Sequence, residues 1–181
     1  TVNTYWTPAG GNYSGSGSIA LNNQRGATTT LAEGDLVLVI QMQCADINSS
    51  DSLNYGDGAG GEPASGYSDP ATGCLAGRYQ FVRAGAGSSN AILNLTGSPL
   101  TAAYEQANAT ATAGRRTFQV IRVPQYANLT LGGTVTAVEW NGDSGGIVVL
   151  DAAFTLNLGA GINVDGLGFR GGAGRSRSVS D

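Results

Sequence analysis

The clearest structural signal in the sequence is Gly34-Asp35-Leu-Val-Leu-Val-Ile-Gln-Met-Gln43, an apolar run that begins after a Gly-Asp turn. A continuous apolar run of this length is typical of a β-strand that is covered on both faces. Segments 77–83 and 117–123 also predict strands, and the second of them ends at a proline. Segment 91–96 follows the first after a Gly/Ser/Asn turn, so we expect segments 77–83 and 91–96 to form a hairpin.

The flanking segments predict shorter elements. Residues 1–26 predict one or two short edge strands, and residues 100–106 hold the only helical turn that we expect. From residue 128 onward, short β runs are separated by glycine and have no strict period. They cover residues 129–131, 135–140, 147–150, 154–158 and 162–164. This pattern suits a β-sandwich or the first coils of a β-solenoid.

These elements together predict one all-β domain over residues 1–172. We expect a β-sandwich or a short β-solenoid with a β-helix-like C-terminal third, carrying one long loop between two cysteines. Residues 173–181 carry no fold signal, and we expect them to be a tail or the start of a linker.

The charge and the lengths of the apolar runs argue against nucleic acid as a partner and against a membrane span. The 181 residues contain no Lys and no His, and nine Arg stand against thirteen acids, for a net charge of −4. Phosphate-driven binding of nucleic acid needs a basic face, which this composition does not supply. No apolar run approaches the roughly 18–20 residues that cross a bilayer, so we expect no membrane span.

Cys44 and Cys74 are the only cysteines. An even count in a loop-rich sequence predicts a disulfide in an oxidising compartment. Two buried free thiols are the alternative, and a metal site built from two thiolates without histidine is less favoured.

The segment between the cysteines is acidic and rich in turn formers, which raises the question of a bound cation. Carboxylate and amide oxygens on flexible turns are the ligands that Ca²⁺ prefers. The candidate ligands of a structural Ca²⁺ are Asp46, Asn48, Asp51 and Asp57. Their spacing fails as an EF-hand, because Asp51 stands where glycine is needed and Asp57 where glutamate is needed. A solvated loop without cofactor, held by the cysteines, is the favoured interpretation.

Gly142-Asp-Ser-Gly-Gly146 matches the nucleophile signature of trypsin-like serine proteases. In those enzymes a histidine takes the proton of the serine hydroxyl. This sequence has no histidine, and it has no lysine for a Ser/Lys pair. We therefore expect Ser144 to be an ordinary hydroxyl in a glycine-rich turn and the chain not to be an enzyme.

A carbohydrate-binding or carbohydrate-active domain is the alternative function. Glycosidases use two carboxylates, and four acids crowd the C-terminal third: Glu139, Asp143, Asp151 and Asp165. Their spacing singles out no pair. Exposed aromatic side chains could stack on sugars, and the candidates for this ligand contact are Trp6, Tyr55 and Tyr67.

Several segments together resemble an N-terminal region of large secreted bacterial surface proteins, which include adhesins and gliding-motility-associated proteins. The segments that carry the resemblance occur in this order: 32–43, Ile47-Asn-Ser49, Tyr55-Gly-Asp57, Gly77-Arg-Tyr-Gln-Phe81, 120–126, Trp140-Asn-Gly142, Gly145-Gly146 and 164–172. They span most of the chain. The resemblance implies a secreted or cell-surface location and supplies no catalytic residue.

We therefore expect a non-catalytic structural or adhesive domain of an extracellular or cell-surface bacterial protein. Its partners would be other surface-protein chains or further copies of itself, joined through β edges, or glycans under the alternative function.

Overall fold

The computed structural model describes residues 1–44, 74–97, 99–110 and 114–169. No helix occurs in these ranges, and the all-β class is confirmed. The strands in chain order are β1 (Thr4–Pro8), β2 (Gly11–Asn12), β3 (Ser18–Gly26), β4 (Leu36–Gln43), β5 (Tyr79–Arg83), β6 (Ile92–Asn94), β7 (Glu105–Gln106), β8 (Thr117–Val123), β9 (Gln125–Thr130) and β10 (Asp151–Asn157). The predicted tail, residues 173–181, lies outside the described residues.

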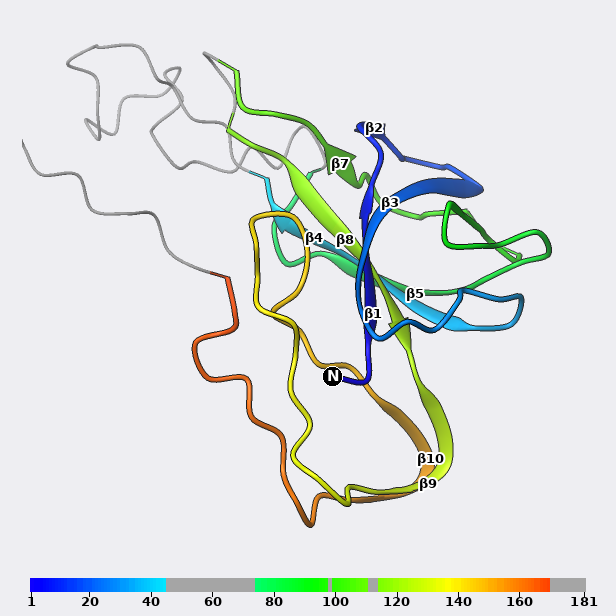
Figure 1. The fold of residues 1–181 in the computed structure, drawn as a ribbon. Helices are drawn as coiled ribbons and strands as arrows, with labels where there is room; N and C mark the ends of the chain where they lie inside the picture. The colour runs from blue at the N-terminus through cyan, green and yellow to red at the C-terminus, as the bar shows by residue number, and fades with distance from the viewer. Residues whose placement is uncertain (45–73, 98, 111–113, 170–181) are drawn as a thin grey trace, which may run out of the picture.

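Six strands form one curled antiparallel sheet, a half-barrel, in the order β5-β4-β8-β1-β3-β6 (Figure 1). Strand β4 is an inner strand next to the edge strand β5, paired with β5 and β8, and is covered on both faces as expected. Val37 and Val39 point into the half-barrel, whereas Leu38 between them joins a second cluster on the outer face. This alternation follows from the two-residue period of a β-strand.

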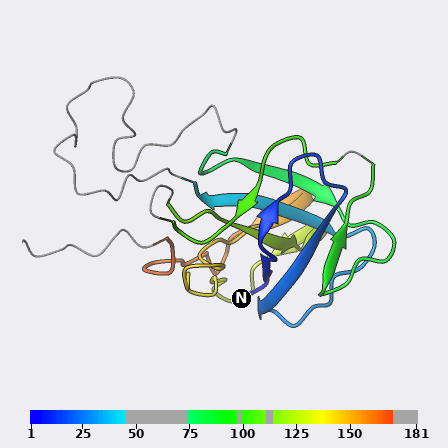
Figure 2. The same ribbon diagram turned by 90° about the horizontal axis from the view of Figure 1, so that it is seen from above.

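The interior of the half-barrel is the main core. Trp6, Phe118 and Tyr104 are its largest buried side chains, and aliphatic residues from five strands fill the space around them. The sheet curls far enough that its two ends approach each other, where Ala84 next to β5 forms an antiparallel bridge with Leu95 next to β6 (Figure 2). The bridge holds the two outer strands around one shared interior.

The predicted hairpin of segments 77–83 and 91–96 is therefore reduced to that bridge. Strand β5 pairs with β4, and β6 pairs with β3, so the two are not neighbours along the sheet. The pairing with β3 buries Leu93 completely in the core. The hairpin prediction rests only on the short connection between the two segments. Burial of Leu93 by pairing with the distant strand β3 outweighs that connection.

Two predictions for the N-terminal half of the chain are wrong. Strand β1 is not an edge strand, because it lies between β8 and β3 and all five of its residues are buried. Residues 100–106 form no helical turn. Leu100 and Tyr104 are buried in the core, and β7 pairs with β2. In both places, apolar side chains that enter the shared interior decide the backbone path.

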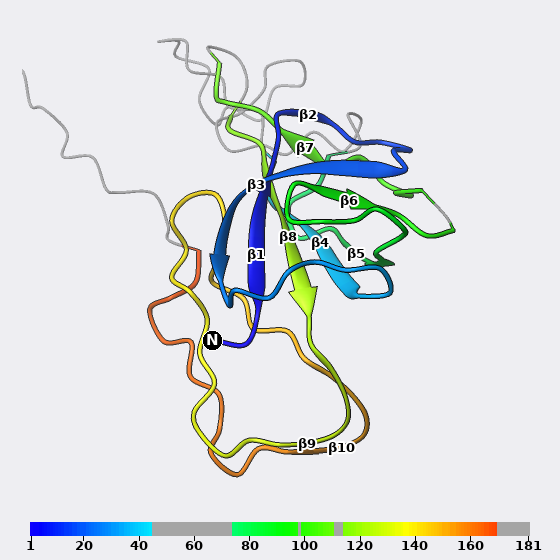
Figure 3. The same cartoon turned by 45° about the vertical axis from the view of Figure 1, so that its right-hand side comes forward.

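The C-terminal third forms a layer outside the half-barrel. Strands β9 and β10 pair in parallel and lie side by side, away from the main sheet (Figure 3). Residues 135–149, here called the outer arm, connect them and cover the outer cluster around Leu38 and Ile121. The expected strands at 135–140 and 147–150 do not form, and Val135 contributes only an isolated parallel bridge to Ile162. The outer arm is held by side-chain hydrogen bonds instead of a strand ladder.

Candidate functional site

The predicted disulfide is confirmed. Cys44 and Cys74 are bonded, their Cα atoms lie 6.0 Å apart, and both residues are buried. The bond joins the end of β4 to the residues that precede β5. The candidate calcium ligands Asp46, Asn48, Asp51 and Asp57 and the aromatic candidates Tyr55 and Tyr67 lie between the cysteines, outside the described residues. Within the described ranges, no group of three or more His, Cys, Asp or Glu could hold a metal ion.

Trp6, the third aromatic candidate, cannot contact a ligand. Its side chain is fully buried in the interior of the half-barrel, on the central strand β1. A ring that stacks on a sugar has to present a face to solvent, so this prediction is wrong. The physical reason is the position of β1 inside the sheet, where both faces of the strand are covered.

The Gly142-Asp-Ser-Gly-Gly146 loop is packed against the half-barrel. Ser144 is 0% exposed, and its hydroxyl has no hydrogen-bond partner. Its backbone carbonyl accepts a hydrogen bond of 2.6 Å from Nη1 of Arg25, on β3. Asn141 Oδ1 accepts hydrogen bonds from the backbone N–H groups of Asp143 and Ser144, both at 3.0 Å. Asp143 forms an ion pair with Arg115. Each of these contacts holds the shape of the loop.

Gly145 occupies the tightest point of the loop. It has a φ of +106°, a conformation that residues with a side chain rarely adopt. A Cβ at this position would lie 2.6 Å from the carbonyl oxygen of Glu139 and 2.7 Å from that of Val138. Glycine is required here both by backbone conformation and by the close approach of the two segments.

A buried glutamine fixes Gly145 to the sheet. Gly145 N–H donates to Oε1 of Gln119 at 2.8 Å, and Gln119 Nε2 donates to the carbonyl of Gly145 at 3.1 Å. Gln119 is on β8 and is fully buried. The side-chain amide therefore satisfies both backbone polar groups of the buried residue Gly145, as a neighbouring strand would.

A buried asparagine does the same at the other end of the outer arm. Asn3 Nδ2 donates to the carbonyl of Val149 at 2.7 Å, and Val149 N–H donates to Asn3 Oδ1 at 3.1 Å. Tyr5 lies beside it, and its hydroxyl donates to the carbonyl of Ile147 at 2.6 Å. Burial raises the pKa of Tyr5 above its ordinary value, so this hydroxyl stays protonated and donating.

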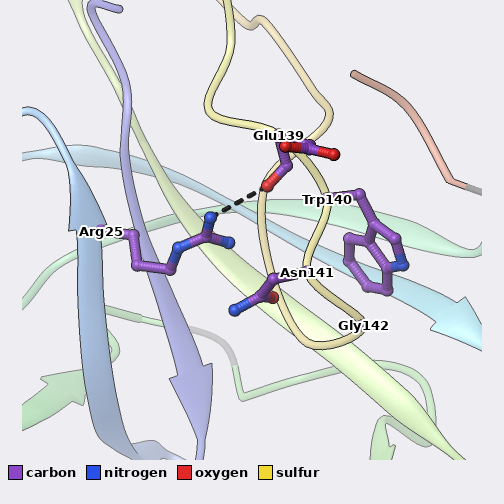
Figure 4. A pocket seen from close by; sticks show the side chains of 5 residues that line it. All are labelled: Arg25, Glu139, Trp140, Asn141 and Gly142. Carbon is purple, nitrogen blue, oxygen red and sulfur yellow. Dashed lines mark hydrogen bonds between the residues drawn. The ribbon is translucent and has the colours of Figure 1, made fainter. Parts of the chain in front are cut away.

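An open pocket lies where the outer arm meets β3. It has a volume of about 440 Å³ and is lined by Arg25, Glu139, Trp140, Asn141 and Gly142 (Figure 4). The Arg25 guanidinium donates to two backbone carbonyls, those of Ser144 and Glu139, so it helps to hold the wall of the pocket. The Trp140 ring packs against Phe169 at a centroid distance of 5.6 Å. Trp140 is only 6% exposed, so the groups that the lining offers to solvent are an amide and an exposed carboxylate.

The four acids of the C-terminal third have separate surroundings. Asp143 pairs with Arg115, and Asp151 accepts a hydrogen bond of 2.6 Å from Gln125. Asp165 lies in a turn in which its N–H donates to the side chain of Asn163, and Glu139 lines the pocket.

Sequence reasoning missed Asn3, Gln119 and Arg25, three of the residues that attach the outer arm. Gln119 alternates with apolar residues in a strand, which is the one signal that marks it, because a polar residue on the buried face of a strand needs a buried partner. The sequence carries no comparable signal for Asn3 or Arg25.

Comparison of the chain with family models, with curated proteins and with solved structures finds no significant match in any of the three. The resemblance to bacterial surface proteins therefore stays a prediction. In the described part of the chain, no helix is long and apolar enough to cross a membrane.

Proposed function

We propose that the chain is a non-catalytic structural or adhesive domain of an extracellular or cell-surface protein. The observation that carries this proposal is the burial of Ser144, which is 0% exposed within a loop that fastens the outer arm to the half-barrel. A catalytic serine must present its hydroxyl to substrate and needs a base to take its proton. The sequence has no His or Lys, and the nearby guanidinium of Arg25 has no acceptor capacity.

The architecture supports a role in support and contact. A half-barrel with a fully buried core is a rigid base, and the outer arm is fixed to it by the buried amides of Asn3 and Gln119. Strands β9 and β10 project from this base with their side chains largely exposed. The disulfide is compatible with an oxidising, extracellular compartment, where such bonds persist.

Labelling with a fluorophosphonate probe tests whether Ser144 is a nucleophile. We expect the folded protein to take up no probe and Ser144→Ala to behave identically. Trypsin serves as the positive control for the probe. Stoichiometric labelling that disappears in Ser144→Ala would refute the non-catalytic assignment.

Carbohydrate binding is the second candidate, and the pocket beside Arg25 is the observation that favours it. The amide of Asn141 and the exposed carboxylate of Glu139 can form hydrogen bonds to sugar hydroxyls, although the Trp140 ring, 6% exposed, offers no face for stacking. A glycan array separates the two candidates. Binding of one sugar class that is lost in Glu139→Gln but kept in Glu33→Gln, an exposed glutamate outside the pocket lining, would favour this function. An array without signal would favour the structural role.

A further inference from the structure

The outer layer contains a structural repeat, which becomes visible when the strand register aligns the two parts of the sequence. Partners in the β9–β10 ladder are 26 or 27 positions apart, for example Gln125 with Asp151 and Leu129 with Leu156. The spacing continues after the strands end, since Val135 forms its parallel bridge with Ile162.

Hydrogen bonds beyond the ladder keep the same offset. Trp140 N–H donates to the carbonyl of Leu167 at 2.9 Å, and Thr134 Oγ1 donates to the carbonyl of Ala160 at 3.3 Å. Residues 124–150 and 151–169 are thus two turns of one stack, here called the first coil and the second coil. The second coil lies on the first in parallel over its whole described length (Figure 3).

The amino-acid sequence repeats at the same offset. Leu129-Thr-Leu131-Gly132 in the first coil corresponds to Leu156-Asn-Leu158-Gly159 in the second. The leucines recur at the same positions, followed by a glycine at the same corner. A repeat that stacks on its neighbour buries its apolar side chains only where another copy covers it.

Burial differs between the two coils at matching positions. Leu131 is 7% exposed and its counterpart Leu158 is 50% exposed, while Val135 is 7% exposed and its counterpart Ile162 is 43% exposed. The side chains are of the same kind and occupy the same place in the repeat. The first coil has a second coil on it, and the described residues place nothing on the second.

The free side of the second coil is also an unpaired backbone edge. Within the described ranges, β10 pairs with β9 alone. The carbonyl of Asn157 faces β9, because it accepts the N–H of Leu131 at 2.9 Å. Successive residues of a strand direct their polar groups to opposite sides, so the N–H and C=O of Leu156 face away from β9. Phe154, on the same strand, is 82% exposed.

We propose that this edge binds a third coil of the same repeat, which pairs in parallel with β10 and covers the apolar row of the second coil. The row consists of Phe154, Leu156, Leu158, Ile162 and Val164. The occupant is polypeptide C-terminal to the second coil that carries Leu-x-Leu-Gly at the same offset. Continuity with the β9–β10 ladder favours this occupant, because parallel addition at the same offset extends both the backbone pairing and the leucine row.

The proposal assigns the half-barrel a specific task within the proposed structural function, on which it rests. The half-barrel closes one end of a parallel β-stack and sets its register, while the free edge propagates the stack. An open edge of this kind is also a site of unwanted pairing unless a coil covers it.

The test extends the full chain by one coil. A copy of residues 124–150 is inserted directly after residue 177. The copy then begins about 27 positions after the start of β10, which is the offset between the first and second coils. Amide hydrogen exchange is then followed in the peptide that spans β10, whose sequence occurs once in the extended chain. We expect exchange of the Leu156 amide to slow by about tenfold or more relative to the chain without the insertion.

The matched control carries the same insertion with aspartate at the two inserted positions that copy Leu129 and Leu131. We expect this control to exchange as fast as the chain without the insertion. Unchanged exchange with the apolar insertion, or equal slowing with both insertions, would overturn the proposal.

A second copy of the chain is the competing occupant. If the chain without insertion sediments as a dimer and its β10 amides slow with rising concentration, the edge serves self-association and the third coil is ruled out. Fluorophosphonate labelling of Ser144 would end the proposed function while leaving these exchange rates unaffected, so the two proposals fail separately.

Discussion

Replacing Gln119 by leucine is expected to release the outer arm from the half-barrel. The substitution keeps a side chain of similar size on β8 but removes both hydrogen bonds to Gly145, which measure 2.8 and 3.1 Å. Gly145 is buried, so its N–H and C=O are then left without a partner or must draw in water. The change tests whether the amide replaces a strand partner for the loop.

The magnitude follows from the two lost bonds. Each hydrogen bond contributes about 0.5–1.5 kcal/mol net, and an orphaned buried polar group costs about 1–3 kcal/mol. We expect Gln119→Leu to lower the free energy of unfolding by about 2–4 kcal/mol, a large share of the roughly 5–15 kcal/mol of an ordinary domain. With a urea m-value of about 2 kcal/mol/M, the midpoint of unfolding falls by about 1–2 M.

Urea unfolding followed by tryptophan fluorescence measures the effect, and Gln24→Leu is the control. Gln24 is exposed on β3, and its side chain accepts one hydrogen bond, from Asn90. We expect the control to change stability by no more than about 0.5 kcal/mol, as surface substitutions usually do. If Gln119→Leu unfolds at the wild-type midpoint, the amide does not hold the loop, and our account of the outer arm is refuted.

Three further changes test the core, the disulfide and the loop. Burial raises the pKa of Tyr104 to about 12, so its contribution to stability should be fully present below about pH 10 and be lost as the pH rises through about 12. Tyr104→Phe should flatten the resulting fall in melting temperature. An unchanged slope would contradict the raised pKa of Tyr104. Replacing Cys44 and Cys74 together by serine should cost about 3 kcal/mol in chemical unfolding, and wild-type protein in reductant should match the double variant. Gly145→Ala should cost at least about 1–3 kcal/mol through backbone strain and the clash with two carbonyls, whereas Gly133→Ala, where a Cβ meets nothing within 4 Å, should be nearly neutral; equal effects would argue against the close approach.

Local pattern was sufficient for the central strands. The apolar run at residues 34–43 and the strand at 117–123 appear as β4 and β8, paired with each other, because a continuous apolar run and a terminating proline act within a few residues. The short segment around Trp6 was placed at an edge, and it lies at the centre of the sheet. Strand order depends on which distant strands bury the tryptophan, and these strands cannot be predicted from a five-residue segment alone.

The protease-like motif at residues 142–146 shows the same contrast between what local sequence predicts and what tertiary contacts decide. Composition bears on its chemistry, because the chain has no histidine or lysine to act as the base for the serine. Its structural use was not predictable, because the contacts of the loop come from Arg25 and Gln119, remote in sequence. The repeat at an offset of 26 or 27 was equally hidden, since few residues recur and only the strand register aligns them.

The sequence alone determined the β class, the cysteine pairing and the absence of a histidine or lysine base for Ser144, since each follows from residue type and local pattern. Tertiary structure alone decided that β1 is central, that the loop around Ser144 is buried, and that among the described residues β10 pairs with β9 alone. These features depend on contacts such as that of Asn3 with Val149, 146 positions apart. In water, the side-chain amide of Asn3 and the backbone of Val149 can each form hydrogen bonds to solvent. Once both are buried, each needs the other as its hydrogen-bond partner, and only the tertiary structure brings them together.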